Sequence, residues 1–148
     1  MTDYTSLISK ARHLTESYLN TVGNLANISS LIYTTLPDIS WAGFYLLKDG
    51  VLELGPFQGK PACMSIPVGK GVCGTSLYKN ETLVVDNVHE FPGHIACDPD
   101  SRSEIVVPLR KNGNPVGVLD IDSSSLSRFD GHDKEGLEAL AELISSLI

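Results

Sequence analysis

Two turn signals constrain the fold of this chain more than any other feature. Asp49-Gly50 and Asn112-Gly113 each separate two apolar, strand-like runs. An Asp-Gly or Asn-Gly pair in that position is typical of a β-hairpin, which joins two neighbouring strands in antiparallel order. The sequence therefore predicts a mainly antiparallel sheet.

The other segments complete an α+β pattern. Apolar residues at helical spacing predict two helices in the first 35 residues, the second running from about Thr21 and ended by Pro37, and a closing helix from near Asp130. Strands are expected at 41–47, 51–54, 62–68, 82–86, 104–109 and 116–122, with a short helix after the Gly-rich start of 69–78. The first helix is expected to have Asp3 or Thr2 as its N-cap, and to carry on one face Leu7, Ile8, Ala11, Leu14 and Tyr18.

These elements predict one domain over residues 1–148. Composition is even along the chain, and no linker or repeat divides it. The expected architecture is a six-stranded antiparallel sheet with the N-terminal and C-terminal helices packed on one face.

Charge and hydropathy exclude two classes of partner. The chain carries 11 Lys and Arg against 18 Asp and Glu, a net charge of −7, and it has no basic stripe for nucleic acid. No apolar run reaches the ~18–20 residues of a membrane span, and the N-terminal residues lack a signal-peptide pattern. We therefore expect a cytoplasmic protein that binds neither nucleic acid nor membrane.

The three cysteines lie in different settings. Cys63 is in a strand-like segment, Cys73 is at the Gly-rich helix start, and Cys97 is in a long polar loop over residues 87–100. An odd number of cysteines favours a reduced or redox-active set over a disulfide framework. Cys63 and Cys73 are also compatible with simple burial in the core. A helix N-terminus would lower the pKa of Cys73, and a protonated histidine such as His94 would do so for Cys97.

Metal and dinucleotide sites are weaker interpretations. His89, His94, Cys97 and Cys73 could supply soft ligands, but the usual ligand spacing of a closed zinc site is lacking. Gly69-x-Gly71-x-x-Gly74 matches a dinucleotide fingerprint, but it does not belong to an early βαβ unit. We expect neither a metal nor a cofactor.

Three carboxylates could share one site. Strand alternation places Asp120 and Asp122 on the same face. A two-residue turn at Asn112-Gly113 would turn Glu104 to the opposite face, whereas a three-residue loop or a bulge would pair Glu104 with Asp122. We predict the second arrangement. Three adjacent carboxyls would raise at least one pKa and provide a proton donor near neutral pH.

Two aromatic residues share a strand face as well. Trp41 and Tyr45 are four residues apart, and Phe44 points the other way. Core packing is the commoner role of such residues, and the wall of a ligand pocket is the functional alternative.

Four motifs, in this order along the chain, resemble the free methionine-(R)-sulfoxide reductases, which are single-GAF-domain enzymes. They are GKGVCG at 69–74, PGHIACD at 92–98, SRSEIVVP at 101–108 and GVLDIDS at 117–123. The resemblance implies a GAF-like fold and the thiol-dependent reduction of free L-methionine-(R)-sulfoxide to methionine.

The resemblance also implies roles for individual residues. Cys97 would be the attacking thiolate, Cys63 the resolving partner and Cys73 a second thiol that exchanges with the disulfide. Glu104, Asp120 and Asp122 would bind the substrate. The resemblance does not assign which acid meets which group, and our own hypothesis places Glu104 and Asp122 near the sulfoxide oxygen and Asp120 near the ammonium group. Trp41 and Tyr45 would surround the methyl end.

The implied reductant is a thioredoxin-like dithiol protein, with no cofactor, and a homodimer is compatible with the sequence. A non-catalytic GAF sensor and an adaptor protein are the alternatives. The acids would repel a cyclic phosphate, and an adaptor would not need three thiols suited to redox chemistry.

Overall fold

A computed structural model describes residues 1–15 and 20–148 of the chain. Within these residues, six strands form one antiparallel sheet in the order β3-β2-β1-β6-β5-β4. The strands are β1 (Trp41–Lys48), β2 (Val51–Gly59), β3 (Ser65–Pro67), β4 (Leu83–Val85), β5 (Ser103–Lys111) and β6 (Asn114–Ser123). The helices are α1 (Tyr4–Leu14), α2 (Thr21–Thr35), α3 (Gly71–Lys79), α4 (Gly131–Ser145) and the 3₁₀ turn η1 (Val88–Glu90).

The three long helices begin at side-chain caps. Asp3, Asn20 and Asp130 each accept a hydrogen bond from the backbone N–H three residues further on. Of the two predicted caps of α1, Asp3 is therefore the correct one. Helix α2 ends at Thr35, two residues before Pro37, as predicted.

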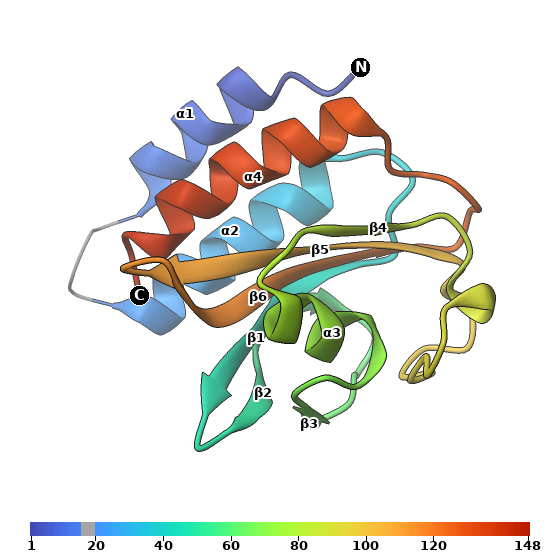
Figure 1. Ribbon diagram of the computed structural model, residues 1–148. Helices are drawn as coiled ribbons and strands as arrows, with labels where there is room; N and C mark the ends of the chain where they lie inside the picture. The colour runs from blue at the N-terminus through green and yellow to red at the C-terminus, as the bar shows by residue number, and fades with distance from the viewer. Residues whose placement is uncertain (16–19) are drawn as a thin grey trace.

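The sheet separates two apolar layers (Figure 1). On one face, α2 and α4 pack against inward residues of the central strands, such as Phe44 and Leu119, and α1 lies over these two helices. This confirms the predicted α+β fold with terminal helices on one face. Leu7 and Ala11 belong to this core, and Tyr18 lies outside the described residues.

Helix α3 covers the opposite face of the sheet. Its Val72, Cys73 and Leu77 pack with Val106 and Val118 in a second apolar cluster. The sequence predicted this helix but not the face that it covers. Because α3 leaves part of the sheet uncovered by helix, the pocket described below forms on this side.

The hairpin between β5 and β6 combines a tight turn with an irregularity. Asn112 and Gly113 have positive φ angles of 52° and 80°, and Lys111 pairs with Asn114 across the two-residue turn. The register then shifts between Leu109 and Arg110, so that Glu104 pairs with Asp122. The predicted pairing is thus confirmed, and a bulge rather than a longer loop produces it.

One predicted strand is shorter than expected. The segment 62–68 forms a strand only over Ser65–Pro67, so the prediction that Cys63 lies in a strand is wrong. The Cys63 carbonyl accepts a hydrogen bond from the Tyr45 hydroxyl at 2.9 Å, and its side chain is bonded to Cys97. These contacts hold residue 63 in the connection between β2 and β3, outside the ladder.

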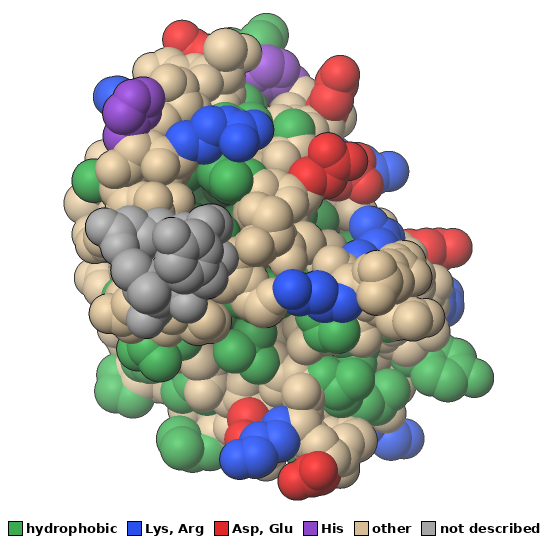
Figure 2. All heavy atoms as spheres, turned by 90° about the vertical axis from the view of Figure 1, so that its left-hand side faces the viewer, with side chains coloured by type: hydrophobic (Ala, Val, Ile, Leu, Met, Phe, Trp, Pro, Cys, Tyr) green, Lys and Arg blue, Asp and Glu red, His purple; other side chains and the backbone are tan. Residues whose placement is uncertain are grey.

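On one face of the molecule the charged side chains are dispersed rather than gathered by sign. On the face shown in Figure 2, basic and acidic groups alternate with apolar and neutral ones. None of the helices that the structure describes combines the length and the apolar character that a membrane crossing requires.

Candidate active site

Strands β1, β6 and β5 present a ladder of side chains on the face that α3 partly covers. Residues paired across the three strands form rows, and successive rows on one face are about 7 Å apart, two residues along the strand. From the strand ends inward, the rows are Trp41–Asp122–Glu104, Gly43–Asp120–Val106 and Tyr45–Val118–Pro108. The sheet therefore places the three predicted carboxylates and both predicted aromatic residues on one surface.

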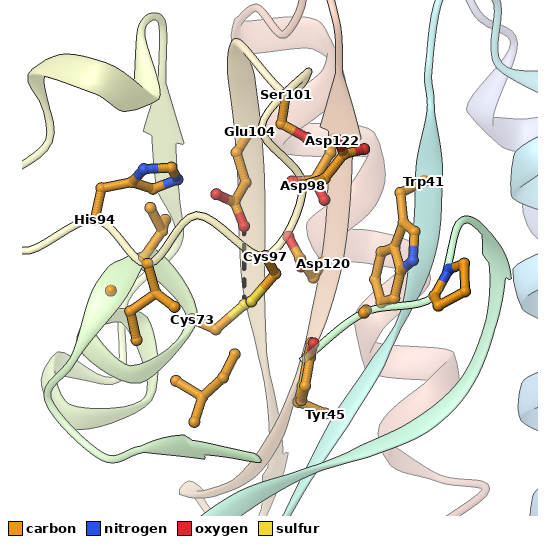
Figure 3. A pocket seen from close by; sticks show the side chains of 16 residues that line it. Trp41, Tyr45, Cys73, His94, Cys97, Asp98, Ser101, Glu104, Asp120 and Asp122 are labelled. Atoms are coloured by element: carbon orange, nitrogen blue, oxygen red, sulfur yellow. Dashed lines mark hydrogen bonds between the residues drawn. The ribbon is translucent and has the colours of Figure 1, made fainter. Parts of the chain in front are cut away.

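A pocket forms over this surface (Figure 3). Helix α3 contributes Cys73, the segment 92–101 contributes Cys97, and the β2–β3 connection contributes Ala62, next to Cys63. The loop over residues 87–100 is thus placed at the site. The pocket collects polar side chains from segments far apart in sequence, among them Trp41, Tyr45, Cys73, His94, Cys97, Asp98, Ser101, Glu104, Asp120 and Asp122.

A disulfide joins Cys63 to Cys97 at this pocket, with Cα atoms 5.4 Å apart. Both residues are half-buried, and the bond crosses between two loops that are 34 residues apart in sequence. The same loops share an ion pair between Lys60 and Asp100 at 2.8 Å, but both of its side chains are largely exposed, so it contributes little. The disulfide is therefore the stronger of these two links between the loops.

Cys73 remains a free thiol and is fully enclosed. Its Sγ lies 3.8 Å from Oε2 of Glu104. Burial, followed by the nearby charges of Asp120 and Glu104, raises the pKa of the Cys73 thiol well above its ordinary value. The predicted lowering of this pKa by the helix N-terminus is therefore wrong, because desolvation and like charge outweigh the helix dipole.

His94 lines the pocket but does not favour a thiolate at Cys97. Partial burial, followed by the neighbouring His89, lowers the pKa of His94. The two imidazole rings meet edge to face with centroids 6.2 Å apart. A histidine that stays neutral near pH 7 supplies no positive charge to Cys97, in contrast to the expectation from the sequence.

The three carboxyls form one cluster, in which Glu104 and Asp120 are buried and Asp122 is half-buried. Burial, and then the negative charge of Asp120, raises the pKa values of Glu104 and Asp122 well above the ordinary range. Burial also raises the pKa of Asp120, but hydrogen bonds that its carboxylate receives from Glu104 and Cys73 act in the opposite direction. The pKa values of all three carboxyls are therefore raised, and hydrogen bonds favour the charged form of Asp120 in particular.

Among the described residues, ligand atoms that could converge on a metal ion come from Cys73, Glu104 and Asp120, all within 4.8 Å of one another. Neither histidine joins this group, and Cys97 is bonded to Cys63. The set of soft ligands considered from the sequence is thus not brought together.

The aromatic wall is fixed by hydrogen bonds at its polar atoms. Trp41 Nε1 donates to the carbonyl of Lys60 at 3.1 Å, and the Tyr45 hydroxyl donates to that of Cys63. The rings of Trp41 and Tyr45 stack with centroids 6.1 Å apart, and Phe57 packs behind Trp41 at 5.2 Å. Both rings belong to the second apolar cluster and also line the pocket. They are therefore core residues and part of the pocket wall at the same time.

Ser101 and Asp98 also line the pocket, although their sequence context did not single them out as site residues. Both lie between Cys97 and Glu104, and Ser101 opens the SRSE motif just before β5. Their position between two expected site residues was the available signal.

An antiparallel sheet with helices on both faces is the fold of a GAF domain, and the pocket of this one carries a disulfide. Residues 18–148 match the model of the GAF domain family. The chain is 52% identical over 127 residues to the free methionine-R-sulfoxide reductase of Escherichia coli (strain K12), which covers 86% of this chain and 77% of the relative.

Solved structures give the same assignment. The fRMsr of Staphylococcus aureus in its reduced form matches with a TM-score of 0.95 and 50% identity, over 100% of this chain and 97% of that one. The free methionine-R-sulfoxide reductase of Neisseria meningitidis, in complex with its substrate, matches with a TM-score of 0.88 and 42% identity, over 96% and 83%. The chain belongs to the free methionine-R-sulfoxide reductase family, which confirms the resemblance seen in its sequence.

Proposed function

We propose that this protein reduces free methionine-(R)-sulfoxide to methionine and uses its own thiols as the immediate reductant. The observation that carries the proposal is the Cys63–Cys97 disulfide at a pocket that also holds two buried carboxyls and the half-buried Asp122. The family membership and the substrate complex of the Neisseria relative support the same activity.

Cys97 is the nucleophile of the proposed reaction. In the reduced protein its thiolate attacks the electrophilic sulfur of the sulfoxide, and the S–O bond breaks. The oxygen, now protonated, transfers to Sγ of Cys97 as the transient bond between Sγ and the substrate sulfur breaks. Methionine leaves with its sulfur reduced by two electrons, and Cys97 is oxidised by two electrons to a sulfenic acid.

Cys63 resolves this intermediate. Its thiol condenses with the sulfenic acid, forming the S–S bond and releasing the oxygen as water. The observed disulfide has the connectivity of this oxidised state. A thioredoxin-like dithiol protein then returns the two electrons by thiol–disulfide exchange.

The three carboxyls have different roles in the proposed reaction. Glu104 and Asp122 have strongly raised pKa values, which suits them to deliver a proton to the sulfoxide oxygen as it transfers. Asp120 accepts hydrogen bonds from its neighbours and bears the negative charge, which suits the substrate ammonium group. Trp41 and Tyr45 form the apolar wall against the methyl end.

Cys73 has a secondary place in this scheme. Its raised pKa makes it a poor nucleophile, so exchange with the Cys63–Cys97 disulfide requires prior loss of a proton to the neighbouring cluster. We therefore assign the first resolution to Cys63 and slower exchange to Cys73.

An epimer-resolved assay of free methionine sulfoxide with excess dithiothreitol tests the proposed function. We expect turnover of the R epimer, no turnover of the S epimer and none of peptide-bound sulfoxide. Turnover of the S epimer alone, or of the peptide, would overturn the proposal. Cys97→Ser is the matched control and should be inactive while it remains folded, because residue 97 lies in a loop.

A further inference from the structure

The two cysteines of the disulfide have different relations to the active-site pocket. Cys97 lines the pocket, whereas Cys63 does not, although its neighbour Ala62 does. Both cysteines are half-buried, in contrast to the enclosed Cys73. A protein reductant is too large to follow an amino acid into the pocket, so it must reach the disulfide from outside. The Cys63 side is the side that the pocket leaves free.

Three exposed apolar residues lie beside the disulfide on these two loops. Pro61 and Met64 are within two residues of Cys63, and Ala96 precedes Cys97. The disulfide holds the loops together with the two Cα atoms 5.4 Å apart, so all three residues lie close to one bond. We call Pro61, Met64 and Ala96 the disulfide rim.

Met64 is the largest side chain of the disulfide rim, and the fold does not use it. It is 75% exposed, and it belongs to neither apolar cluster of the described residues. Its backbone is nevertheless fixed, because its carbonyl accepts a hydrogen bond from the Leu54 N–H at 2.9 Å. A single exposed apolar residue is common on protein surfaces. Met64 differs in that it adjoins a bond that an exchange partner has to touch.

The disulfide rim also favours one kind of contact. None of its three side chains is charged, and Lys60 and Asp100 beside it pair with each other at 2.8 Å. A neutral, apolar contact zone is therefore what the loops present around the disulfide. The flexible, polarisable thioether of a methionine suits contact with such a zone on another protein.

We propose that a dithiol protein docks on the disulfide rim, with Met64 as its main apolar contact, and attacks Sγ of Cys63. The inference rests on the proposed function and adds the surface and the sulfur at which the reductant acts. Attack at Cys63 frees Cys97 at the wall of the pocket, where the next substrate needs it.

The exchange balances in two steps. A thiolate of the reductant forms an S–S bond with Sγ of Cys63, and the Cys63–Cys97 bond breaks with Cys97 leaving as a thiolate. The second thiol of the reductant then loses its proton and attacks its own partner sulfur in the mixed disulfide. Cys63 leaves and takes up a proton. The reductant is oxidised by two electrons to a disulfide, and this chain is reduced by two.

The first test compares a protein reductant with a small one. The disulfide form is reduced either by thioredoxin, kept reduced with its reductase and NADPH, or by dithiothreitol, with no methionine sulfoxide present. For Met64→Gln we expect KM for thioredoxin to rise about tenfold, the loss of one buried apolar side chain, and the rate with dithiothreitol to change less than about twofold. Met64→Leu, which stays apolar, should keep KM within about twofold of wild type.

Val22→Gln is the matched control. Val22 is 68% exposed and also apolar, but it lies on α2, on the other face of the sheet. We expect its reduction by both reagents to follow wild type.

The second test identifies the sulfur that is attacked. A thioredoxin whose second active-site cysteine is replaced by serine stops at the mixed disulfide. Peptide mapping should find it joined to Cys63, with Cys97 open to alkylation.

A mixed disulfide at Cys97 would overturn the assignment of the attacked sulfur. Wild type that only dithiothreitol reduces, an unchanged KM in Met64→Gln, or equal losses with both reagents or in Met64→Leu would overturn the docking surface. Failure of the proposed function would be seen elsewhere, in the epimer-resolved assay, because these tests contain no sulfoxide.

Discussion

Glu104 faces Asp122 directly across the β5–β6 ladder, and the third carboxyl, Asp120, lies one row further along β6. The pairing depends on the register shift between Leu109 and Arg110. Without this irregularity the tight turn would point Glu104 to the opposite face, into the core beneath α4. A backbone feature distant from the pocket thus creates its carboxyl cluster.

The cluster should reduce the stability of the fold as pH rises. Folding raises the pKa of Glu104, so the native state binds its proton more tightly than the unfolded state does. Stability is therefore lost as pH rises from the ordinary range of a glutamate toward the raised value. Glu104→Gln removes this contribution, and urea unfolding at pH 8 should show a gain on the order of 1 kcal/mol that shrinks toward pH 5.

Glu104→Gln should lower activity although it raises stability. Its kcat should fall at least tenfold, because the proton donor is lost. Glu53→Gln, an exposed position on β2, controls for the change in net charge. A Glu104→Gln protein that is less stable than wild type at pH 8 would contradict the buried, protonated carboxyl.

The first turnover should have a descending alkaline limb. Protons on Glu104 and Asp122 assist departure of the sulfoxide oxygen, so the rate of methionine release should fall once pH exceeds their raised pKa values. Burial raises the pKa of Tyr45 far above that of a free tyrosine, so its hydroxyl does not titrate there. Single-turnover assays with Tyr45→Phe should keep the limb. A rate that only rises up to pH 10 would exclude the proposed acids.

Cys63→Ser should separate resolution from chemistry. The variant retains Cys97, so methionine should be released in a first turnover at nearly the wild-type rate. Recycling by a thioredoxin-like protein should slow by at least tenfold, because Cys73 is enclosed and its pKa is raised. Rapid-quench assays with and without the reductant measure the two steps. An equal loss in both would contradict a resolving role.

Gly43→Ala should disturb the aromatic wall. A Cβ at this position would overlap the side chain of Phe57 and lie 2.8 Å from Cη2 of Trp41. We expect a loss of roughly 1–3 kcal/mol in unfolding free energy and a raised KM. At Gly131 a Cβ meets nothing within 4 Å, so Gly131→Ala is the control and should leave both unchanged. An unaltered KM in a destabilised Gly43→Ala protein would show that Trp41 does not shape the substrate site.

Local sequence patterns predicted most of the helices and strands. The two turn pairs, the caps and the helical spacing depend on neighbours in sequence, so they predicted the antiparallel sheet and its terminal helices. The register of Glu104 could also be predicted. Strand alternation allows its side chain on either of two faces, and the grouping of the acids favours the face of Asp120 and Asp122. Which of loop or bulge supplies that register depends on packing, which the sequence does not display.

The environment of single side chains was harder to foresee. Cys73 was expected to be acidic from its place at a helix start, but its pKa is decided by burial against Glu104 and Asp120, which arrive from two distant strands. Cys63 looked like a strand residue because its neighbours are apolar and β-branched residues follow it. For Ser101 the signal was limited to its place between Cys97 and Glu104, because an unbonded hydroxyl is visible only after every other partner has been placed.

The central claim is that Cys97 and Cys63 together reduce one substrate molecule, and a thiol count tests it most directly. The fully reduced protein is mixed with excess methionine-(R)-sulfoxide in the absence of any other reductant, and free thiols and methionine are counted. We expect the number of free thiols to fall from three to one, with one methionine released per chain, the remaining thiol mapping to Cys73 and the new bond to Cys63–Cys97. Methionine release without loss of two thiols, or an initial disulfide that contains Cys73, would contradict the claim.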